Sequence, residues 1–219
     1  MTDYKSIIFD LDGTLLDTLT DLANSANAVL EQNGFPIHPE ESYKTFVGNG
    51  MFTLMKRALP DQNRDDETVK RMTTAMNDEY RNRWDETTAP YAGIPEMLDA
   101  FNEKGVPISI LSNKPHEFTL KTVDKLLGDF SFEQVLGVRD GKEPKPDPAG
   151  AIEIAGLLDL DPSDIIFCGD SSVDMDTAKN AGMFAAGVLW GFRSEAELRE
   201  HGADAIIQKP DDLLELIQE

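Results

Sequence analysis

The chain has 219 residues, of which 41 are acidic and 20 are basic, so its formal net charge is −21. This excess of negative charge disfavours binding to nucleic acid or to an anionic membrane, and an anionic ligand would need a local cation. Hydrophobic residues make up 40% of the chain, enough for a core, but no apolar stretch approaches the roughly 20 residues of a membrane span. The single cysteine, Cys168, excludes an intrachain disulfide, so we expect a core thiol in a cytoplasmic protein.

Short apolar runs rich in β-branched residues predict strands over residues 7–9, 106–111 and 165–168, with weaker candidates at 132–136, 185–189 and 205–207. Helical patterns lie between and after these runs, over residues 117–127, 148–158, 173–181 and 211–217. Strands that alternate with helices are typical of an α/β fold with a doubly wound parallel sheet. We therefore predict a Rossmann-like core.

The segment from residue 18 to residue 84 interrupts this alternation. It contains no convincing strand, and its apolar residues recur at helical spacing over 19–30 and 69–80. We predict an inserted helical cap at residues 18–87 and an α/β catalytic core formed by residues 1–17 and 88–219. The connections near residues 15–18 and 85–91, the second of which contains Pro90, are expected to act as hinges.

Polar residues follow each of the main predicted strands. They are Asp10, Asp12, Gly13 and Thr14 after the first, Ser112, Asn113 and Lys114 after the second, and residues 169–174 after the third, while Lys145 lies in the proline-rich segment 140–148. Ligands of open parallel sheets bind beyond the carboxyl ends of the strands, where these residues would gather. Several carboxylates side by side need a cation, and oxygen ligands suit Mg²⁺, while a lysine and a serine hydroxyl suit a phosphoryl group.

The pair Asp10 and Asp12, two residues apart after a strand, allows three interpretations by itself: a metal site, a proton relay or a nucleophile. The wider pattern narrows the choice. Residues 10–14, Ser112, Lys145 and residues 169–174 resemble, in order and spacing, the four motifs of the haloacid dehalogenase-like hydrolase superfamily in its phosphatase branch. The helical insertion after the first motif resembles that family's cap domain.

The resemblance implies a role for each matching residue. Asp10 would be the nucleophile that forms an aspartyl-phosphate, and Asp12 the general acid and base. Mg²⁺ would be held by the Asp10 carboxylate, the Asp12 backbone carbonyl and Asp170, with Asp174 either near the metal or orienting Lys145. The phosphoryl oxygens would be bound by Gly13, Ser112, Asn113 and Lys145, with Gly13 and Asn113 acting through their backbone.

We expect the substrate to be selected by residues of the predicted cap. Residues 46–51, which enter a helix expected to end near residue 59, resemble the phosphoglycolate phosphatases. Gly48, Asn49 and Gly50 would offer backbone N–H groups at a helix start to an anion, which suits the carboxylate of 2-phosphoglycolate. A plain loop with a helix cap is the alternative. The expected reaction is hydrolysis of 2-phosphoglycolate to glycolate and phosphate.

Other functions stay open on the sequence. The substrate could be another small phosphate, such as a sugar phosphate, a nucleotide or pyrophosphate, and a phosphosugar mutase similar to β-phosphoglucomutase would share all four motifs. A non-catalytic binding protein is disfavoured, because Asp10, Asp12, Lys145 and Asp170 are all intact. We expect a small phosphorylated metabolite as the partner. The sequence does not distinguish a monomer from a dimer, or Mg²⁺ from Mn²⁺ or Co²⁺.

Overall fold

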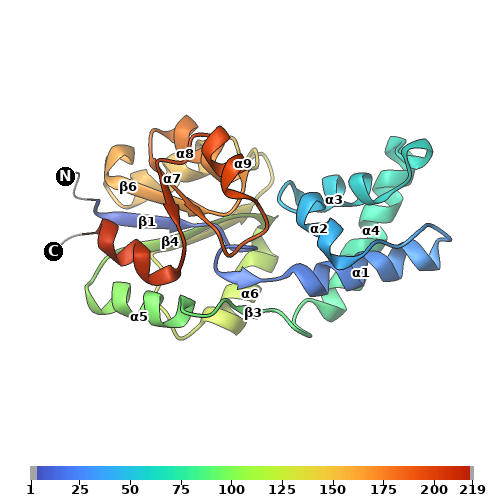
Figure 1. Ribbon diagram of the computed structural model, residues 1–219, viewed down its shortest axis with the longest axis horizontal. Coiled ribbons are helices and arrows are strands. Elements are labelled where there is room, and N and C mark those ends of the chain that lie inside the picture. The colour runs from blue at the N-terminus through green and yellow to red at the C-terminus, as the bar shows by residue number, and fades with distance from the viewer. Residues whose placement is uncertain (1–3, 218–219) are drawn as a thin grey trace. The chain divides into compact units, whose positions relative to one another are not determined.

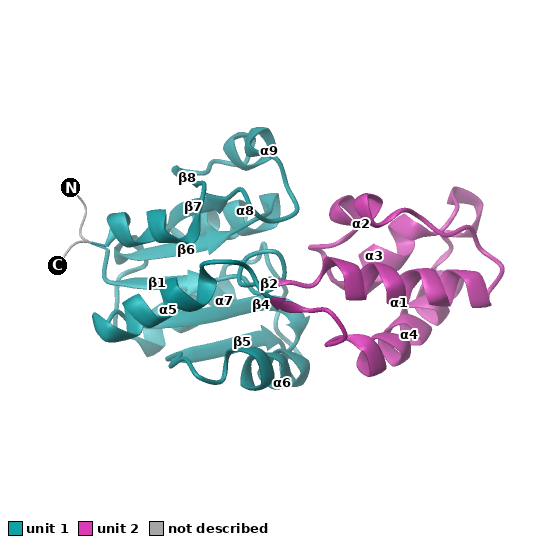
Figure 2. Ribbon diagram, turned by 60° about the horizontal axis from the view of Figure 1, so that its bottom comes forward, with its two compact units in different colours: residues 1–16, 90–219 teal, residues 17–89 magenta. Residues whose placement is uncertain are grey.

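The computed structural model describes residues 4–217, which form two compact units (Figure 2). The first unit comprises the chain up to Leu16 and from Pro90 onward, and the second comprises residues Asp17–Ala89. The chain passes between them through β2 (Leu16–Asp17) and β3 (Ala89–Pro90), which pair as a two-stranded sheet. The roles of catalytic core and cap for these units stay predictions.

The first unit is built on a six-stranded sheet (Figure 1). Its order is β5–β4–β1–β6–β7–β8, with bounds β1 Ser6–Phe9, β4 Ile108–Pro115, β5 Gln134–Val138, β6 Ile165–Gly169, β7 Phe184–Val188 and β8 Ala205–Ile207. Neighbouring strands pair in parallel, so the predicted doubly wound α/β fold is confirmed. The strand order reverses at β1, because the chain adds β4 and β5 on one side and β6 to β8 on the other. A site at the end of β1 is therefore at the switch point of the sheet.

Helices cover both faces of this sheet. On one face lie α5 (Ile94–Glu103), α6 (His116–Leu127) and the 3₁₀ helix η3 (Pro210–Leu216), and on the other lie α7 (Ala149–Leu157), α8 (Ser172–Ala181) and α9 (Glu195–Glu200). A short 3₁₀ turn, η2 (Pro162–Asp164), precedes β6. Alternate residues of a strand point to opposite faces, which explains why residues 7–9 of β1 and residues 165–168 of β6 are all apolar.

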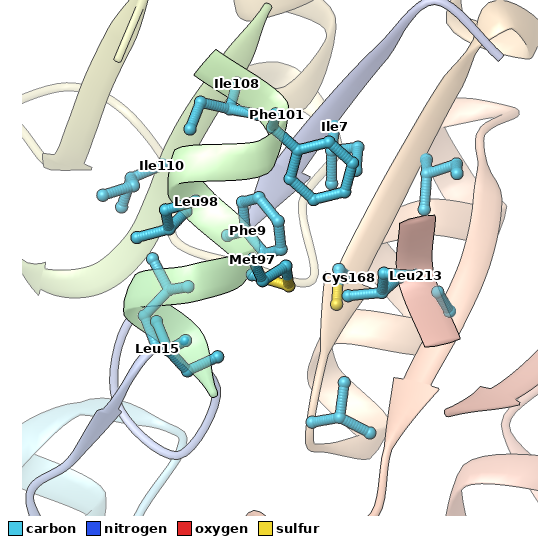
Figure 3. Close-up of a cluster of buried hydrophobic side chains, with 14 of the residues drawn as sticks. Ile7, Phe9, Leu15, Met97, Leu98, Phe101, Ile108, Ile110, Cys168 and Leu213 are labelled. Atoms are coloured by element: carbon cyan, nitrogen blue, oxygen red, sulfur yellow. The ribbon is translucent and has the colours of Figure 1, made fainter. Parts of the chain in front are cut away.

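The hydrophobic core under α5 shows this alternation directly. Ile7 and Phe9 of β1 pack with Met97 and Phe101 of α5 (Figure 3), whereas Ile8 points to the opposite core. The Phe9 and Phe101 rings lie 6.3 Å apart between centroids. Both faces of β1 are thus fully buried, and this fixes the position of the residues that follow it.

Some element boundaries differ from those that the sequence predicted. The second main strand does not end at Leu111: β4 continues to Pro115, with a register shift against β5 between these residues. Residues 210–216 form a 3₁₀ helix, where the sequence indicated an α-helix, and its first turn contains Pro210. The helix α5 was not predicted from the sequence; it begins directly after Gly93 and carries Pro95 in its first turn.

The second unit is helical. It contains α1 (Leu19–Gln32), α2 (Glu40–Phe46), α3 (Gly50–Ala58), the 3₁₀ turn η1 (Asp61–Asn63) and α4 (Asp66–Arg83). The helical spacing predicted over 19–30 and 69–80 is confirmed by α1 and α4, whose buried faces include Leu22, Leu30, Met72 and Met76. Over residues 4–217 no helix is both long and apolar enough to cross a membrane.

A buried carboxylate ties the end of this unit to its first helix. Asp21 of α1 is 1% exposed and accepts hydrogen bonds from the backbone N–H and the hydroxyl of both Thr87 and Thr88, at 2.6 to 3.1 Å. Burial alone would raise the pKa of Asp21, but these hydrogen bonds outweigh burial and lower the pKa below its usual value. The segment that leads into β3 is therefore held by an ionised side chain.

Candidate active site

The end of β1 places Asp10 at the centre of the sheet. Its backbone N–H donates to the carbonyl oxygen of Cys168 at 2.9 Å, so the β1–β6 ladder continues into the acidic motif. Its Oδ1 accepts a hydrogen bond from the N–H of Leu11 at 2.7 Å and lies 2.8 Å from Nζ of Lys145. The rotamer of this buried carboxylate is therefore fixed from two sides.

A tight turn brings the backbone that follows Asp10 against Asp170. Gly13 has φ of +89°, and its N–H donates to the Leu16 carbonyl at 2.8 Å. A Cβ atom at Gly13 would lie 2.5 Å from Oδ2 of Asp170 and 2.7 Å from the Phe192 ring. Both the backbone angle and the space require glycine here.

Lys145 and Asp174 form the buried centre of the charge network. Nζ of Lys145 lies 2.6 Å from Oδ1 of Asp174 and 2.8 Å from Oδ1 of Asp10, and the lysine side chain is 3% exposed. Oδ2 of Asp174 accepts from the N–H and hydroxyl of Ser171, at 3.1 and 2.6 Å, in a capping box at the start of α8. Burial opposes the charge on Lys145, but the two carboxylates outweigh it and raise the pKa of the ammonium. Both carboxylate oxygens of Asp174 are therefore engaged by donors of the protein itself, those of Lys145 and Ser171.

The structure gives Asn113 a side-chain contact that the sequence did not predict. Its Oδ1 accepts from the N–H of Lys145 at 2.8 Å, and its Nδ2 donates to the Lys145 carbonyl at 3.0 Å. This reciprocal pair fixes the backbone of Lys145 against β4. The Oγ of the neighbouring Ser112, which is 3% exposed, accepts from the N–H of Lys114 at 3.2 Å.

Lys114 is a second buried cation, and the sequence assigned it no role. Its Nζ lies 3.0 Å from Oδ1 of Asp12 and 5.4 Å from the centroid of the Phe118 ring, and its side chain is 3% exposed. Asp12 therefore has its own ammonium partner, distinct from the one that serves Asp10. The position of Lys114 directly after Ser112 and Asn113 could have marked it as a candidate site residue. The predicted end of the strand, however, does not show in which direction its side chain points.

The loop that follows β7 also reaches the site and was missed. The N–H of Phe192 donates to Oδ2 of Asp170 at 2.7 Å, and the indole Nε1–H of Trp190 donates to the Thr14 carbonyl at 2.9 Å. The same strand-end rule that identified the other motifs would have found this loop, because a strand at residues 185–189 was predicted.

The acidic side chains that gather here fit a divalent cation. Carboxylate oxygens of Asp10, Asp170 and Asp174 lie within 4.8 Å of one another. Burial, and then repulsion by Asp174, raise the pKa of Asp10 to about 7, although Lys145 opposes this. Burial and the neighbouring carboxylates also raise the pKa of Asp170. The ammonium of Lys145 contacts the carboxylates of Asp10 and Asp174, and both of these repel the carboxylate of Asp170. A hard dication would therefore relieve the excess negative charge and lower the raised pKa values.

The candidate specificity segment belongs to the second unit. Gly48 and Gly50 have φ of +107° and +79°, and α3 begins at Gly50. Arg57 braces this loop, because it donates to the carbonyls of Thr45 and Phe46, each at 3.1 Å, and to Oδ1 of Asn49 at 3.0 Å. The role of Gly48, Asn49 and Gly50 in binding a substrate stays a prediction.

Comparison with known proteins agrees with the motif pattern. The model of the haloacid dehalogenase-like hydrolases matches residues 7–188. Phosphoglycolate phosphatase from Haemophilus influenzae is 31% identical over 99% of this chain and 98% of its own length, and that from Aquifex aeolicus is 28% identical over 97% and 96%. A solved structure from Lactobacillus delbrueckii subsp. bulgaricus, 31% identical, aligns with a TM-score of 0.93 over 98% of both chains. The structure of a predicted phosphoglycolate phosphatase from Haemophilus somnus, 28% identical, aligns with 0.89 over all of both.

Proposed function

The chain belongs to the haloacid dehalogenase-like hydrolase family, in its phosphatase branch, and we propose that it hydrolyses 2-phosphoglycolate with Mg²⁺ through an aspartyl-phosphate on Asp10. The observation that carries the proposal is the setting of Asp10. It lies buried at the switch point of the sheet, 2.8 Å from the ammonium of Lys145 and within 4.8 Å of further acidic oxygens. A nucleophile, a cation for the phosphoryl group and metal ligands therefore meet at one place.

The metal would be held by the carboxylates of Asp10 and Asp170 and by the backbone carbonyl of Asp12. Asp174 is less suited to direct ligation, because its two oxygens accept from Lys145 and Ser171. When bound, Mg²⁺ would withdraw negative charge from the phosphoryl oxygens and orient them.

In the first step a carboxylate oxygen of Asp10 forms a bond to phosphorus, and the ester P–O bond breaks. The carboxyl group of Asp12 gives its proton to the departing alkoxide, which leaves as the alcohol. The ammonium of Lys145 stabilises the charge on the phosphoryl oxygens during transfer.

In the second step the Asp12 carboxylate takes a proton from water as the water oxygen bonds to phosphorus. The bond between phosphorus and Asp10 breaks, which releases inorganic phosphate and restores the Asp10 carboxylate. Lys114, with its Nζ 3.0 Å from Asp12, holds this carboxylate in place between the two steps.

The identity of the substrate rests on two supports. The curated relatives named above are phosphoglycolate phosphatases. The loop that Arg57 braces also begins a helix, whose N-terminal end favours an anionic group such as the substrate carboxylate. A small phosphorylated metabolite is therefore the partner that we propose.

The test is a panel of phosphomonoesters assayed with Mg²⁺ and with EDTA. The panel holds 2-phosphoglycolate, a sugar phosphate, a nucleotide, pyrophosphate and p-nitrophenyl phosphate. We expect 2-phosphoglycolate to have the highest kcat/KM and EDTA to abolish turnover. Asp10→Asn should be inactive, whereas the matched control Asp17→Asn, an exposed acid beyond the motif, should keep its activity. Turnover that survives both EDTA and Asp10→Asn would contradict the mechanism.

A second variant tests the specificity segment. Asn49→Ala removes the contact with Arg57 and should lower kcat/KM for 2-phosphoglycolate more than for p-nitrophenyl phosphate, which carries no carboxylate. Equal effects on the two substrates would contradict a role of this loop in substrate selection. A sugar phosphate that is hydrolysed faster than 2-phosphoglycolate would replace the proposed substrate.

A further inference from the structure

We propose that residues 190–193, the β7 loop, position Asp170 and the turn at residues 12–14 for metal binding. The inference rests on the proposed metal site and extends it beyond the four motifs, none of which includes this loop. Three sets of contacts carry it: the first is made to Asp170, the second is made to the turn by Gly191 and Trp190, and the third joins Arg193 to Glu197 in α9.

The first contact fixes the Asp170 carboxylate. The backbone N–H of Phe192 donates to Oδ2 at 2.7 Å, and Asp170 is 1% exposed. A hydrogen bond from a rigid backbone group to one carboxylate oxygen fixes the plane of that carboxylate and thus the direction of its other oxygen. Groups that hold metal ligands in this way commonly change metal affinity or activity 10- to 100-fold when they are altered.

The second contact involves Gly191, which lies between Asp170 and the turn. A Cβ atom there would clash with Cβ of Asp170 and with the Gly13 carbonyl oxygen, and would lie 2.6 Å from Oδ2 of Asp170. The backbone of Gly191 is outside the left-handed region, so an alanine would be tolerated by its φ angle and excluded only by space. The β7 loop therefore approaches both metal-site elements as closely as a glycine allows.

Trp190 links the loop to the other side of the turn. Its indole N–H donates to the carbonyl of Thr14 at 2.9 Å, while its ring packs against the hydrophobic core under α5. Thr14 is two residues from Asp12, whose backbone carbonyl is a proposed metal ligand. The indole thus connects the position of the turn to the packed core.

The third contact anchors the far end of the loop. Nε of Arg193 lies 3.3 Å from Oε1 of Glu197 in α9, and the same oxygen accepts from the hydroxyl of Ser172 at 2.8 Å. Ser172 begins α8, two residues after Asp170. The loop is therefore held at both ends while its middle contacts Asp170, as expected of a rigid support for a ligand.

The experiment measures Mg²⁺ binding directly, by isothermal titration calorimetry and by the rise in Tm that Mg²⁺ produces. The proteins are the wild type, Gly191→Ala, Trp190→Phe and the control Gly156→Ala, which adds a methyl group in open space on α7. Gly191→Ala should weaken Mg²⁺ binding about tenfold or more and reduce the Tm rise. Trp190→Phe keeps an aromatic ring but loses the N–H donor and part of the indole, so binding should weaken about fivefold. Gly156→Ala should bind as the wild type does.

Each outcome decides a different point. If the wild type binds Mg²⁺ and both loop variants bind it equally well, the positioning role of the β7 loop is wrong, while the proposed function is unaffected. If the wild type binds no Mg²⁺, the proposed metal site is wrong and this inference falls with it. Should Gly191→Ala fail to fold, Trp190→Phe alone decides, because it keeps an aromatic ring against the core and adds no atom to the crowded loop.

Discussion

Asp174→Asn tests how far stability and turnover depend on the ion pair between Asp174 and Lys145. The change keeps the size of the side chain but removes the negative charge 2.6 Å from Nζ of Lys145. If the amide oxygen keeps its hydrogen bonds from Ser171, the NH₂ group faces the ammonium, and two donors cannot bond to each other. Breaking a buried ion pair from one side destabilises a fold by about 3–5 kcal/mol. For a chain of this length that lowers Tm by on the order of 10 °C.

Turnover should fall as well, because Lys145 would keep only Asp10 as its carboxylate partner and lose its fixed direction. The loss of a pre-oriented group that stabilises a transition state lowers kcat by about 100-fold. The measurements are thermal unfolding by circular dichroism and steady-state hydrolysis of 2-phosphoglycolate at saturating Mg²⁺.

The matched control is Asp176→Asn, two residues further along α8. Asp176 is partly exposed and contacts Nδ1 of His201 at 3.0 Å, so its replacement should change stability by less than about 1 kcal/mol. The reasoning is refuted if Asp174→Asn unfolds at the same temperature as Asp176→Asn and keeps a comparable kcat.

Two further predictions follow from other carboxylates. Asp21→Asn places an amide among the four hydrogen-bond donors of Thr87 and Thr88, so it should destabilise the protein by about 3 kcal/mol and lower Tm by roughly 6–12 °C. The control Asp17→Asn, at an exposed position, should leave Tm unchanged. Equal Tm values for the two variants would contradict this prediction. Folding raises the pKa of Asp10 from 3.8 to about 7. The free energy of unfolding of the metal-free protein should therefore fall as pH rises between these two values, because the folded protein then has to ionise Asp10. Because Mg²⁺ binds the ionised form, its affinity in calorimetry should fall about tenfold per pH unit below pH 7, and a flat profile from pH 5.5 to 7.5 would contradict the assignment.

The sequence predicted those parts of the fold that depend on the pattern of apolar residues. Residues 7–9 and 165–168 are apolar at every position because both faces of β1 and β6 are covered, and they were identified as strands for that reason. The end of β4 could not be predicted in the same way. Residues 112–115 are polar or proline, and their strand conformation depends on pairing with β5 through a register shift, which no local pattern indicates.

The candidate site shows a similar division. The residues after β1, β4 and β6 could be assigned to one site from the sequence, because a parallel sheet brings the carboxyl ends of its strands to the same edge. Sequence could not show that the amide of Asn113 holds the backbone of Lys145, or that Lys114 pairs with Asp12, since both depend on side-chain direction. The contact from Phe192 to Asp170 is made by a backbone N–H, which leaves no residue-type signal at all.

The central claim is that Asp10 becomes covalently phosphorylated during turnover. The most direct measurement is rapid acid quenching during hydrolysis of a phosphate monoester with Mg²⁺, followed by mass spectrometry of the peptide that contains Asp10 and Asp12. We predict the added mass of one phosphoryl group on Asp10. With p-nitrophenyl phosphate, whose leaving group needs no proton from Asp12, the phosphoryl group should accumulate further in Asp12→Asn, because this variant cannot activate the water of the second step. Continued turnover with no phosphoryl group on Asp10, or with the group on another residue, would contradict the proposed mechanism.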